Sequence, residues 1–190
     1  MVTVVDALVQ QKGLIERDGR WEIQGGVEKV TLEVPESLQQ LVEQQLWRLS
    51  AEDQRVLEGS SVTGMQFSAA AVAAGLKERV DAVEERCSSL ARRGQFLQSS
   101  GTEEWPDGTV GERYRFRHTL YRQAVYDRLP GGRRIQLHAR IGARVEAGYR
   151  DQAVERAAEL ATHFEQGREY TKAVHYLKHA AEKALQRYAY

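Results

Sequence analysis

The sequence predicts a mostly α-helical protein with one small β-hairpin. Over most of the 190 residues, apolar side chains recur every three or four positions, which is the period of an amphipathic helix. Only short stretches read as strands, above all "RYRFR", in which Tyr114 and Phe116 alternate with arginines. Glycines and the three prolines fall between these stretches, where they end helices or form turns. The length allows one or two small domains, each with its own core.

Residues 1–34 are expected to hold the end of a helical lid domain and a hairpin. The apolar residues of 3–12 share one helical face, and Gly13 can cap that helix. In "LIERDGRWEI", Asp18-Gly19 is a type I′ turn signal between two apolar pairs, and the rest of this segment is predicted to be loop. A chain that opens on such elements is expected to be a piece of a longer protein.

Residues 35–130 are expected to form a winged-helix domain that begins with helices. Pro35 suits the first turn of a helix over 35–49. Ser50 and Ser68 are N-cap candidates for two further helices, which are predicted to end near residues 64 and 75.

A third helix of this domain is predicted over 78–93 and is followed by two strands. Its inward-facing residues are expected to be Val80, Val83, Cys87, Leu90 and Ala91. "FLQSS" and "RYRFR" then form two strands around a glycine-containing loop. The order helix, helix, helix, strand, loop, strand over 51–117 is typical of a winged helix, with the hairpin as the wing.

Residues 131–190 are expected to form a helical repeat of the tetratricopeptide (TPR) type. Helices are predicted over 118–129, 133–148, 151–166 and 170–188, with breaks at "PGG", Gly148 and Gly167. In the last two helices, small and aromatic residues occupy the positions that a TPR helix pair uses: Ala161, Phe164, Tyr170, Ala173, Tyr176, Ala180 and Ala184. Since one repeat cannot bury its own face, we expect further repeats beyond Tyr190.

The charges of the chain balance, but their distribution is uneven. Lys+Arg and Asp+Glu both number 27. Nine arginines lie between Arg113 and Arg144, where Asp127 is the only acid, so this stretch is where an anion is expected to bind. Cys87 is the only cysteine, which predicts a reducing, cytoplasmic location. No apolar run of 18 residues occurs, and no membrane partner is expected.

Several catalytic and binding motifs are absent or weak. No lysine follows a glycine, so there is no P-loop, and neither G-x-S-x-G nor H-E-x-x-H occurs. The chain is therefore not expected to be an enzyme. Cys87 is interpreted as a core residue, and His175 and His179 as surface residues rather than zinc ligands. "PGGRR" is interpreted as a turn before a helix rather than a phosphate cradle.

Direct DNA binding by the helix over 78–93 is not favoured. Its four arginines, at 79, 86, 92 and 93, are matched by acids at 78, 81, 84 and 85. Phosphate contacts supply most of the affinity for DNA, so a helix that lies beside phosphates is expected to be basic.

Four stretches resemble the C-terminal half of the bacterial STAND-type regulatory ATPases, AAA-related proteins fused to cyclases, protein kinases or transcriptional-regulator domains. They are "VPESLQQLVEQQLWRLSAEDQRVLEGSSVTGMQFS", "LARRGQFLQSS", "YRFRHTLYRQAVYDRLPGGRRIQLHARIGARVE" and "AAELATHFEQGREYTKAVHYLKHAAEKA". The resemblance implies that the Walker segments lie upstream, outside this chain. It also implies that ADP or ATP with Mg is held in cis by that upstream NTPase domain, and that no cofactor belongs to this fragment.

The resemblance also implies a phosphate-sensing site. In apoptotic and plant-immunity relatives, the histidine of a Met-His-Asp motif after the wing strand touches the β-phosphate of ADP. This motif falls on Arg117-His118-Thr119, where only the histidine is kept. His118 is thus the candidate phosphate contact, with Arg117 and Arg115 as weaker candidates. An imidazole held between a strand and a helix can donate an N–H to a phosphate oxygen; the alternative is that His118 caps the helix or packs against the wing.

Three functions follow from these observations. The preferred one is a regulatory, non-catalytic fragment that couples the nucleotide state of the upstream domain to partner binding through the helical repeats. The second is a DNA-binding winged helix of a transcriptional regulator that uses the arginines of residues 113–144. The third is a helical-repeat scaffold for protein interactions, in which His118 has no role.

Overall fold

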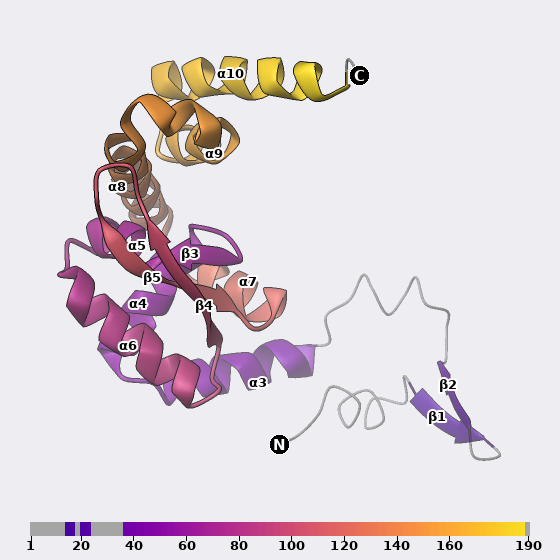
Figure 1. Cartoon of the computed structure of the whole chain (residues 1–190). Helices are drawn as coiled ribbons and strands as arrows, with labels where there is room; N and C mark the ends of the chain where they lie inside the picture. The colour runs from indigo at the N-terminus through magenta and orange to yellow at the C-terminus, as the bar shows by residue number, and fades with distance from the viewer. Residues whose placement is uncertain (1–13, 18–19, 24–35, 189–190) are drawn as a thin grey trace. The chain divides into compact units, whose positions relative to one another are not determined.

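The computed structural model describes residues 14–17, 20–23 and 36–188, which fall into two compact units, 1–49 and 50–190. The described part is mostly helical, with a small three-stranded antiparallel sheet in the second unit and a two-stranded hairpin in the first (Figure 1). The helix end expected over 3–12 and the loop expected over 24–34 lie outside the described residues. No described helix has both the length and the apolar character needed to cross a membrane.

The first unit contains a hairpin and a helix. Strands β1 (Leu14–Arg17) and β2 (Arg20–Ile23) pair antiparallel, with Arg17 opposite Arg20, which confirms the predicted hairpin. Helix α3 (Glu36–Trp47) lies within the helix predicted over 35–49.

The second unit opens with two helices, and of the two serines predicted to cap them only the first makes a cap hydrogen bond. Helix α4 spans Ala51–Ser61, and Ser50 Oγ accepts a hydrogen bond from the Asp53 N–H at 3.1 Å, as predicted. Helix α5 spans Ala69–Leu76, but Ser68 makes no side-chain cap bond, and its buried hydroxyl has no hydrogen-bond partner. The position of this second cap is therefore correct, whereas the predicted cap bond is wrong.

Helix α6 (Val80–Arg92) buries most of its predicted face. Val83, Cys87 and Leu90 are fully buried. Val80 is 36% exposed, so its predicted burial is wrong, because it is the first helical residue and lies at the end of the apolar stripe. Gly94, with a φ of +66°, follows the helix and turns the chain into the sheet.

The sheet has the order β3–β5–β4, with β3 at Gln66–Ser68, β4 at Leu97–Glu104 and β5 at Val110–Phe116. The two predicted strands are β4 and β5, whereas β3 was missed because three residues are too few to show a period. Phe67 lies opposite Tyr114 in the register, and its ring also contacts Phe116. Helices α5 and α6 pack against the sheet and bury these aromatic rings.

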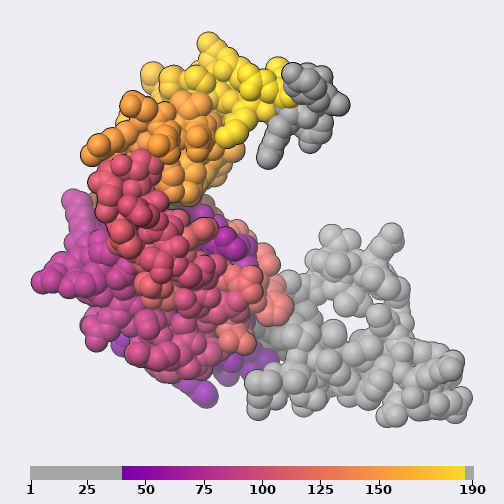
Figure 2. Space-filling view, in the orientation of Figure 1, coloured from indigo at the N-terminus to yellow at the C-terminus, as the bar shows by residue number. Residues whose placement is uncertain are grey.

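The remaining helices are α7 (Thr119–Asp127), α8 (Gly131–Tyr149), α9 (Ala157–Gln166) and α10 (Tyr170–Tyr188). The helix predicted over 151–166 is divided: η1 (Arg150–Arg156) is a 3₁₀ segment, entered through Arg150 with a φ of +47°. Helix α8 packs on α5 and α9, and α9 packs on α10. Figure 2 shows α9 and α10, in orange and yellow, projecting from the body that contains the sheet.

The predicted small and aromatic residues of α9 and α10 are buried only in part. Ala161, Phe164, Ala173 and Tyr176 are buried, and the rings of Phe164 and Tyr176 stack at 5.7 Å. Tyr170 is 62% exposed, because it is the first residue of α10 and lies away from α9.

Candidate functional site

His118 lies at the junction of β5 and α7, where the sequence period changes from strand to helix. It is the N-cap residue of α7, with an extended backbone, and its carbonyl oxygen accepts from the Tyr121 N–H at 3.1 Å. Its side chain makes no cap bond, so His118 does not cap the helix through its imidazole. The backbone on both sides therefore fixes the residue and leaves the ring free for another partner.

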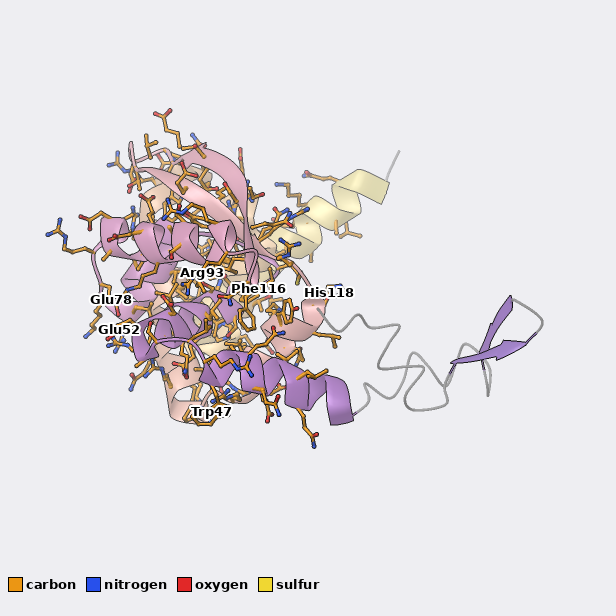
Figure 3. All side chains as sticks on the ribbon, turned by 90° about the horizontal axis from the view of Figure 1, so that it is seen from below. Trp47, Glu52, Glu78, Arg93, Phe116 and His118 are labelled. Atoms are coloured by element: carbon orange, nitrogen blue, oxygen red, sulfur yellow. The ribbon has the colours of Figure 1, made fainter. Side chains whose placement is uncertain are left out.

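The imidazole of His118 is exposed and has one aromatic neighbour. Its ring meets that of Tyr121 edge-on at 6.1 Å, and Tyr121 in turn packs on Phe96 at 4.9 Å. Neither ring nitrogen has a hydrogen-bond partner among the described residues. Figure 3 marks His118 at the start of α7 and Phe116 just before it on the strand.

The two predicted arginines share the outer face of β5 with Arg113. Tyr114 and Phe116 point inward and are 2% exposed, as the alternation predicts, whereas Arg115 and Arg117 are exposed. The Arg117 backbone N–H donates to the Phe96 carbonyl at 2.8 Å, while its guanidinium has no partner in the described part of the chain. Arg115, at the end of β5, and Arg117 and His118, just after that strand, are thus all exposed.

Not every cation on this face is available. Arg113 is bound to Glu103 at 3.3 Å and to the Gln66 side-chain oxygen at 3.1 Å. Arg115 lies against Gln98. With the side-chain amide of Gln98 oriented so that its oxygen faces the guanidinium, this oxygen accepts hydrogen bonds from Arg115. Arg117 and His118 are therefore the two groups best placed to meet an external anion.

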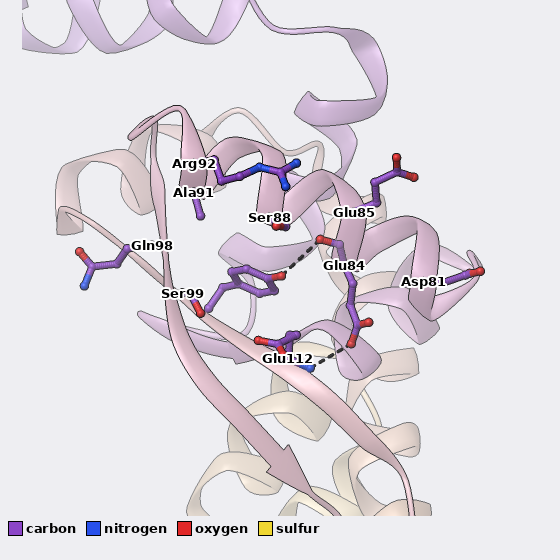
Figure 4. Close-up of a pocket in the computed structure, with 10 residues that line it drawn as sticks. Asp81, Glu84, Glu85, Ser88, Ala91, Arg92, Gln98, Ser99 and Glu112 are labelled. Atoms are coloured by element: carbon purple, nitrogen blue, oxygen red, sulfur yellow. Dashed lines mark hydrogen bonds between the residues drawn. The ribbon is translucent and has the colours of Figure 1, made fainter.

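A groove of about 700 Å³ lies between α6 and the β4–β5 hairpin (Figure 4). Tyr114 is buried in its wall, donates to the Glu84 carbonyl at 3.2 Å, and has its pKa raised to about 12 by burial. The Glu84 carboxylate accepts from the Glu112 N–H at 2.9 Å. The other lining residues are Asp81, Glu85, Ser88, Ala91, Arg92, Gln98 and Ser99. Four carboxylates against one arginine make this groove unsuitable for phosphate.

The arginines of α6 are mostly bound to acids of the protein itself. Arg79 makes two hydrogen bonds to Asp81, at 3.0 and 2.6 Å. Asp53 on α4 accepts from Arg93 at 3.0 Å and lies 3.8 Å from Arg86. This helix therefore presents few free cations to a nucleic acid.

The loop of the β4–β5 hairpin contacts α8, which the sequence did not predict. Arg144 on α8 donates to the Asp107 carboxylate at 2.9 Å and to Thr109 Oγ1 at 2.7 Å. The Trp105 ring is buried, lies 4.5 Å from the Arg144 guanidinium, and contacts Tyr149 at 5.3 Å. Hydrogen bonds from Thr109, together with Arg144, lower the pKa of Asp107 to about 2. The sequence predicted only a glycine-containing loop between the two strands.

Two buried histidines were also not predicted from the sequence. His138 on α8 and His163 on α9 face each other, with their Nδ1 atoms 3.1 Å apart, and Tyr126 Oη lies 3.4 Å from His138 Nε2. Burial lowers the pKa of His138 to about 4 and that of His163 to about 3. Both are therefore neutral at pH 7 and share one hydrogen bond between α8 and α9.

Three lesser candidates can also be placed. Cys87 is fully buried, and burial raises the pKa of its thiol far above the usual range, so it is a core residue. The rings of His175 and His179 are 4.7 Å apart, and the described residues hold no group of three metal ligands. In "PGGRR", Pro130 is the N-cap of α8 and residues 131–134 are already its first turn, so the predicted turn and the predicted helix start at 133 are wrong.

Comparison of the chain with protein-family models, with curated proteins and with solved structures found no match.

Proposed function

We propose that this chain is a non-catalytic regulatory segment of a STAND-type signal-transducing ATPase. In this proposal, residues 35–130 form a winged-helix domain and residues 131–190 form a TPR-like repeat. Together they couple ADP or ATP, held with Mg by an upstream NTPase domain in cis, to the binding of a protein partner. In this proposal DNA is not the partner, because three of the four arginines in and beside α6 lie against Asp53 or Asp81.

The observation that carries this proposal is the free imidazole of His118. Both of its nitrogens lack a hydrogen-bond partner among the described residues, and the exposed guanidinium of Arg117 is its chain neighbour. A phosphate of a bound nucleotide can accept from both groups, and charge-assisted hydrogen bonds of this kind are strong. Tyr121 and the helix backbone hold His118 in place, so the hydrogen bond from its imidazole to the phosphate would have a fixed direction. This directional hydrogen bond is lost when the phosphate leaves.

The hairpin loop offers a route from His118 to the repeat. His118 lies two residues after the end of β5, and the loop at the other end of this strand is bound to α8 through Asp107 and Arg144. A displacement of β5 is therefore transmitted to α8 through a charge-assisted hydrogen bond and the packed Trp105 ring. The proposal therefore requires a second position of β5 when no phosphate is bound, because a ligand biases a conformational equilibrium only between two arrangements.

One face of α10 favours the second candidate function, a protein-interaction scaffold. Tyr170, Val174, Leu177 and Leu185 are between 51% and 72% exposed and recur at helical spacing. The opposite face of α10 carries Tyr176, which packs on Phe164 of α9. An apolar stripe of this kind is typical of helices that bind a protein partner. Under the regulatory proposal, this is the surface through which the output is read.

His118→Ala in the natural polypeptide that carries this chain tests the proposal. We expect the variant to release bound ADP faster than the wild-type protein, because a hydrogen bond to the phosphate is lost. His175→Ala is the matched control, since His175 is also exposed but lies on α10. Unchanged ADP release and unchanged output in His118→Ala would remove the sensor and leave the scaffold.

A further inference from the structure

A small cavity between α4, α5 and α8 is lined by three arginines. Arg55 comes from α4, and Arg133 and Arg140 come from α8. The cavity has a volume of about 120 Å³. That volume is about four times the ~30 Å³ that one water occupies in the liquid, which suits a tetrahedral oxyanion and is too small for a nucleoside. We propose that this Arg55–Arg133–Arg140 cavity binds a phosphate group.

The position of the cavity is fixed by close packing of α5 on α8. Arg133 and Arg140 are two helical turns apart, so they lie on one face of α8. Arg140 donates to the Gly75 carbonyl at 3.2 Å, which holds its guanidinium against the end of α5. A Cβ atom at Gly75 would lie only 2.8 Å from Ile141 Cγ1, so the two helices approach as closely as a glycine permits. The close packing fixes the backbones from which Arg133 and Arg140 extend, and the bond to Gly75 orders the Arg140 side chain before a ligand binds.

The three guanidiniums have more donors than their protein partners use. Arg133 binds Glu58 at 2.9 Å, and Arg55 binds Glu78 at 3.0 Å. Each guanidinium carries five N–H donors, so most of them remain for a ligand. Three arginines against these two carboxylates leave the site with a positive charge.

A buried donor of Arg133 also lacks a partner. Its Nε atom is shielded from solvent and has no hydrogen bond within the described part of the chain. Buried donors are almost always satisfied, so an orphaned one needs an explanation. The Nε of Arg134, which does not line the cavity, is in the same state, so this donor does not by itself indicate a ligand. The proposal rests on the exposed terminal N–H groups of the three guanidiniums, which can donate charge-assisted hydrogen bonds to a phosphate oxygen. This site does not involve His118 or the end of β5, and it is therefore additional to the proposed nucleotide contact.

Calorimetric titration of the 190-residue chain with inorganic phosphate, at low chloride concentration, tests the proposal. We expect binding that Arg140→Gln weakens roughly tenfold or more, the usual effect of losing a charge-assisted hydrogen bond. Arg79→Gln is the matched control, because it removes an exposed arginine that is also bound to an acid. Arg140→Lys keeps the charge but not the planar fork, and we expect it to bind less tightly than wild type. Circular dichroism of each variant confirms that it is folded.

A second titration, with ADP, identifies the source of the phosphate. If the wild-type chain binds ADP more tightly than phosphate and Arg140→Gln loses this difference, the natural ligand is the terminal phosphate of a nucleotide. If the wild-type chain binds both equally, the natural ligand is free phosphate. His118→Ala leaves either result unchanged, which separates this site from the proposed sensor. The proposal is overturned if the wild-type chain does not bind phosphate, or if Arg79→Gln weakens binding as much as Arg140→Gln does.

Discussion

Arg144 and Asp107 join the β4–β5 hairpin to the first long helix after it, through a hydrogen bond of 2.9 Å between guanidinium and carboxylate. The contact is reinforced on the backbone, where the Asp107 N–H donates to the carbonyl of Gly148 at 3.1 Å. The Trp105 ring packs over the same turn of α8. The hairpin loop is thus bound to α8 at the point where that helix ends and η1 begins.

Gly148 makes this contact possible, and Gly148→Ala should disrupt it. A Cβ atom at this position would overlap the Trp105 ring and lie 2.6 Å from Arg144 Nη1. We expect the substitution to lower the free energy of unfolding by about 1–3 kcal/mol, as overpacking does. Urea unfolding measures this change, and fluorescence in a background without Trp21 and Trp47 reports whether Trp105 becomes exposed.

Gly132→Ala is the control for that variant. Gly132 lies in the first turn of the same helix, and a Cβ atom there would meet nothing within 4 Å. Since alanine favours helix, we expect no loss of stability and a gain of up to about 1 kcal/mol. Equal changes in the free energy of unfolding for the two variants would show that the packing of Trp105 does not require a glycine at position 148.

Replacing the two N-cap serines, Ser50 and Ser68, by alanine should have different effects on the stability of the protein. Ser50 accepts a cap hydrogen bond from Asp53, so Ser50→Ala should destabilise the protein by about 1 kcal/mol. Ser68 makes no cap bond and has a buried hydroxyl without a partner, so Ser68→Ala should be neutral or stabilising. Chemical denaturation of both variants under one condition tests the pair. A loss of stability in Ser68→Ala as large as in Ser50→Ala would contradict this interpretation.

These serines also show how far the sequence predicts the structure. Both precede an apolar helix, and both helices begin where predicted, because helix starts depend on local pattern. Whether the hydroxyl reaches the backbone depends on the neighbouring packing, which local pattern does not contain. In the same way, the burial of Cys87 followed from its spacing, while the exposure of Val80 depended on where α6 begins.

The candidate site was predictable in position but not in its surroundings. The change of period placed His118 between a strand and a helix, which is where the structure has it. The bond between Asp107 and Arg144 joins residues 37 positions apart, and the hydrogen bond between His138 and His163 joins residues 25 apart. No local period encodes such pairs, since they depend on how α8 crosses the hairpin and α9.

The buried pair of His138 and His163 should make the stability of the protein depend on pH. Their folded pKa values, about 4 and about 3, lie below the value of about 6.5 in the unfolded chain. Below pH 6.5 the unfolded state therefore binds protons that the folded state does not. The contribution of this pair to the free energy of unfolding should be constant above this pH and fall toward pH 4, by about 1.4 kcal/mol per pH unit for each histidine.

Urea unfolding between pH 4.5 and pH 7.5 (roughly the window in which histidines titrate) measures this slope. The double variant His138→Leu, His163→Leu should show a much shallower dependence on pH, because both titrating groups are removed. His175→Gln should keep the full slope, since His175 is exposed on α10. An undiminished slope in the double variant would assign the pH dependence to other groups.

Binding to random duplex DNA should be weak and lost with salt. Arg79, Arg86 and Arg93 of α6 are occupied by carboxylates, and the groove beside this helix is acidic. Arg117, just after β5, is left to meet phosphates, together with Arg115, whose charge is not neutralised by its neutral partner Gln98. A few such contacts give non-specific binding that falls steeply between roughly 50 and roughly 200 mM salt.

A gel-shift titration over that range of salt tests this prediction, with Arg115→Ala, Arg117→Ala as the double variant. We expect the double variant to weaken the residual binding for every DNA sequence alike, because phosphate contacts carry no sequence information. Arg79→Ala should leave binding unchanged, since this arginine is held by Asp81. Tight binding to one sequence that persists at high salt would favour a DNA-binding protein over the regulatory function, because free cations on β5 cannot by themselves distinguish bases.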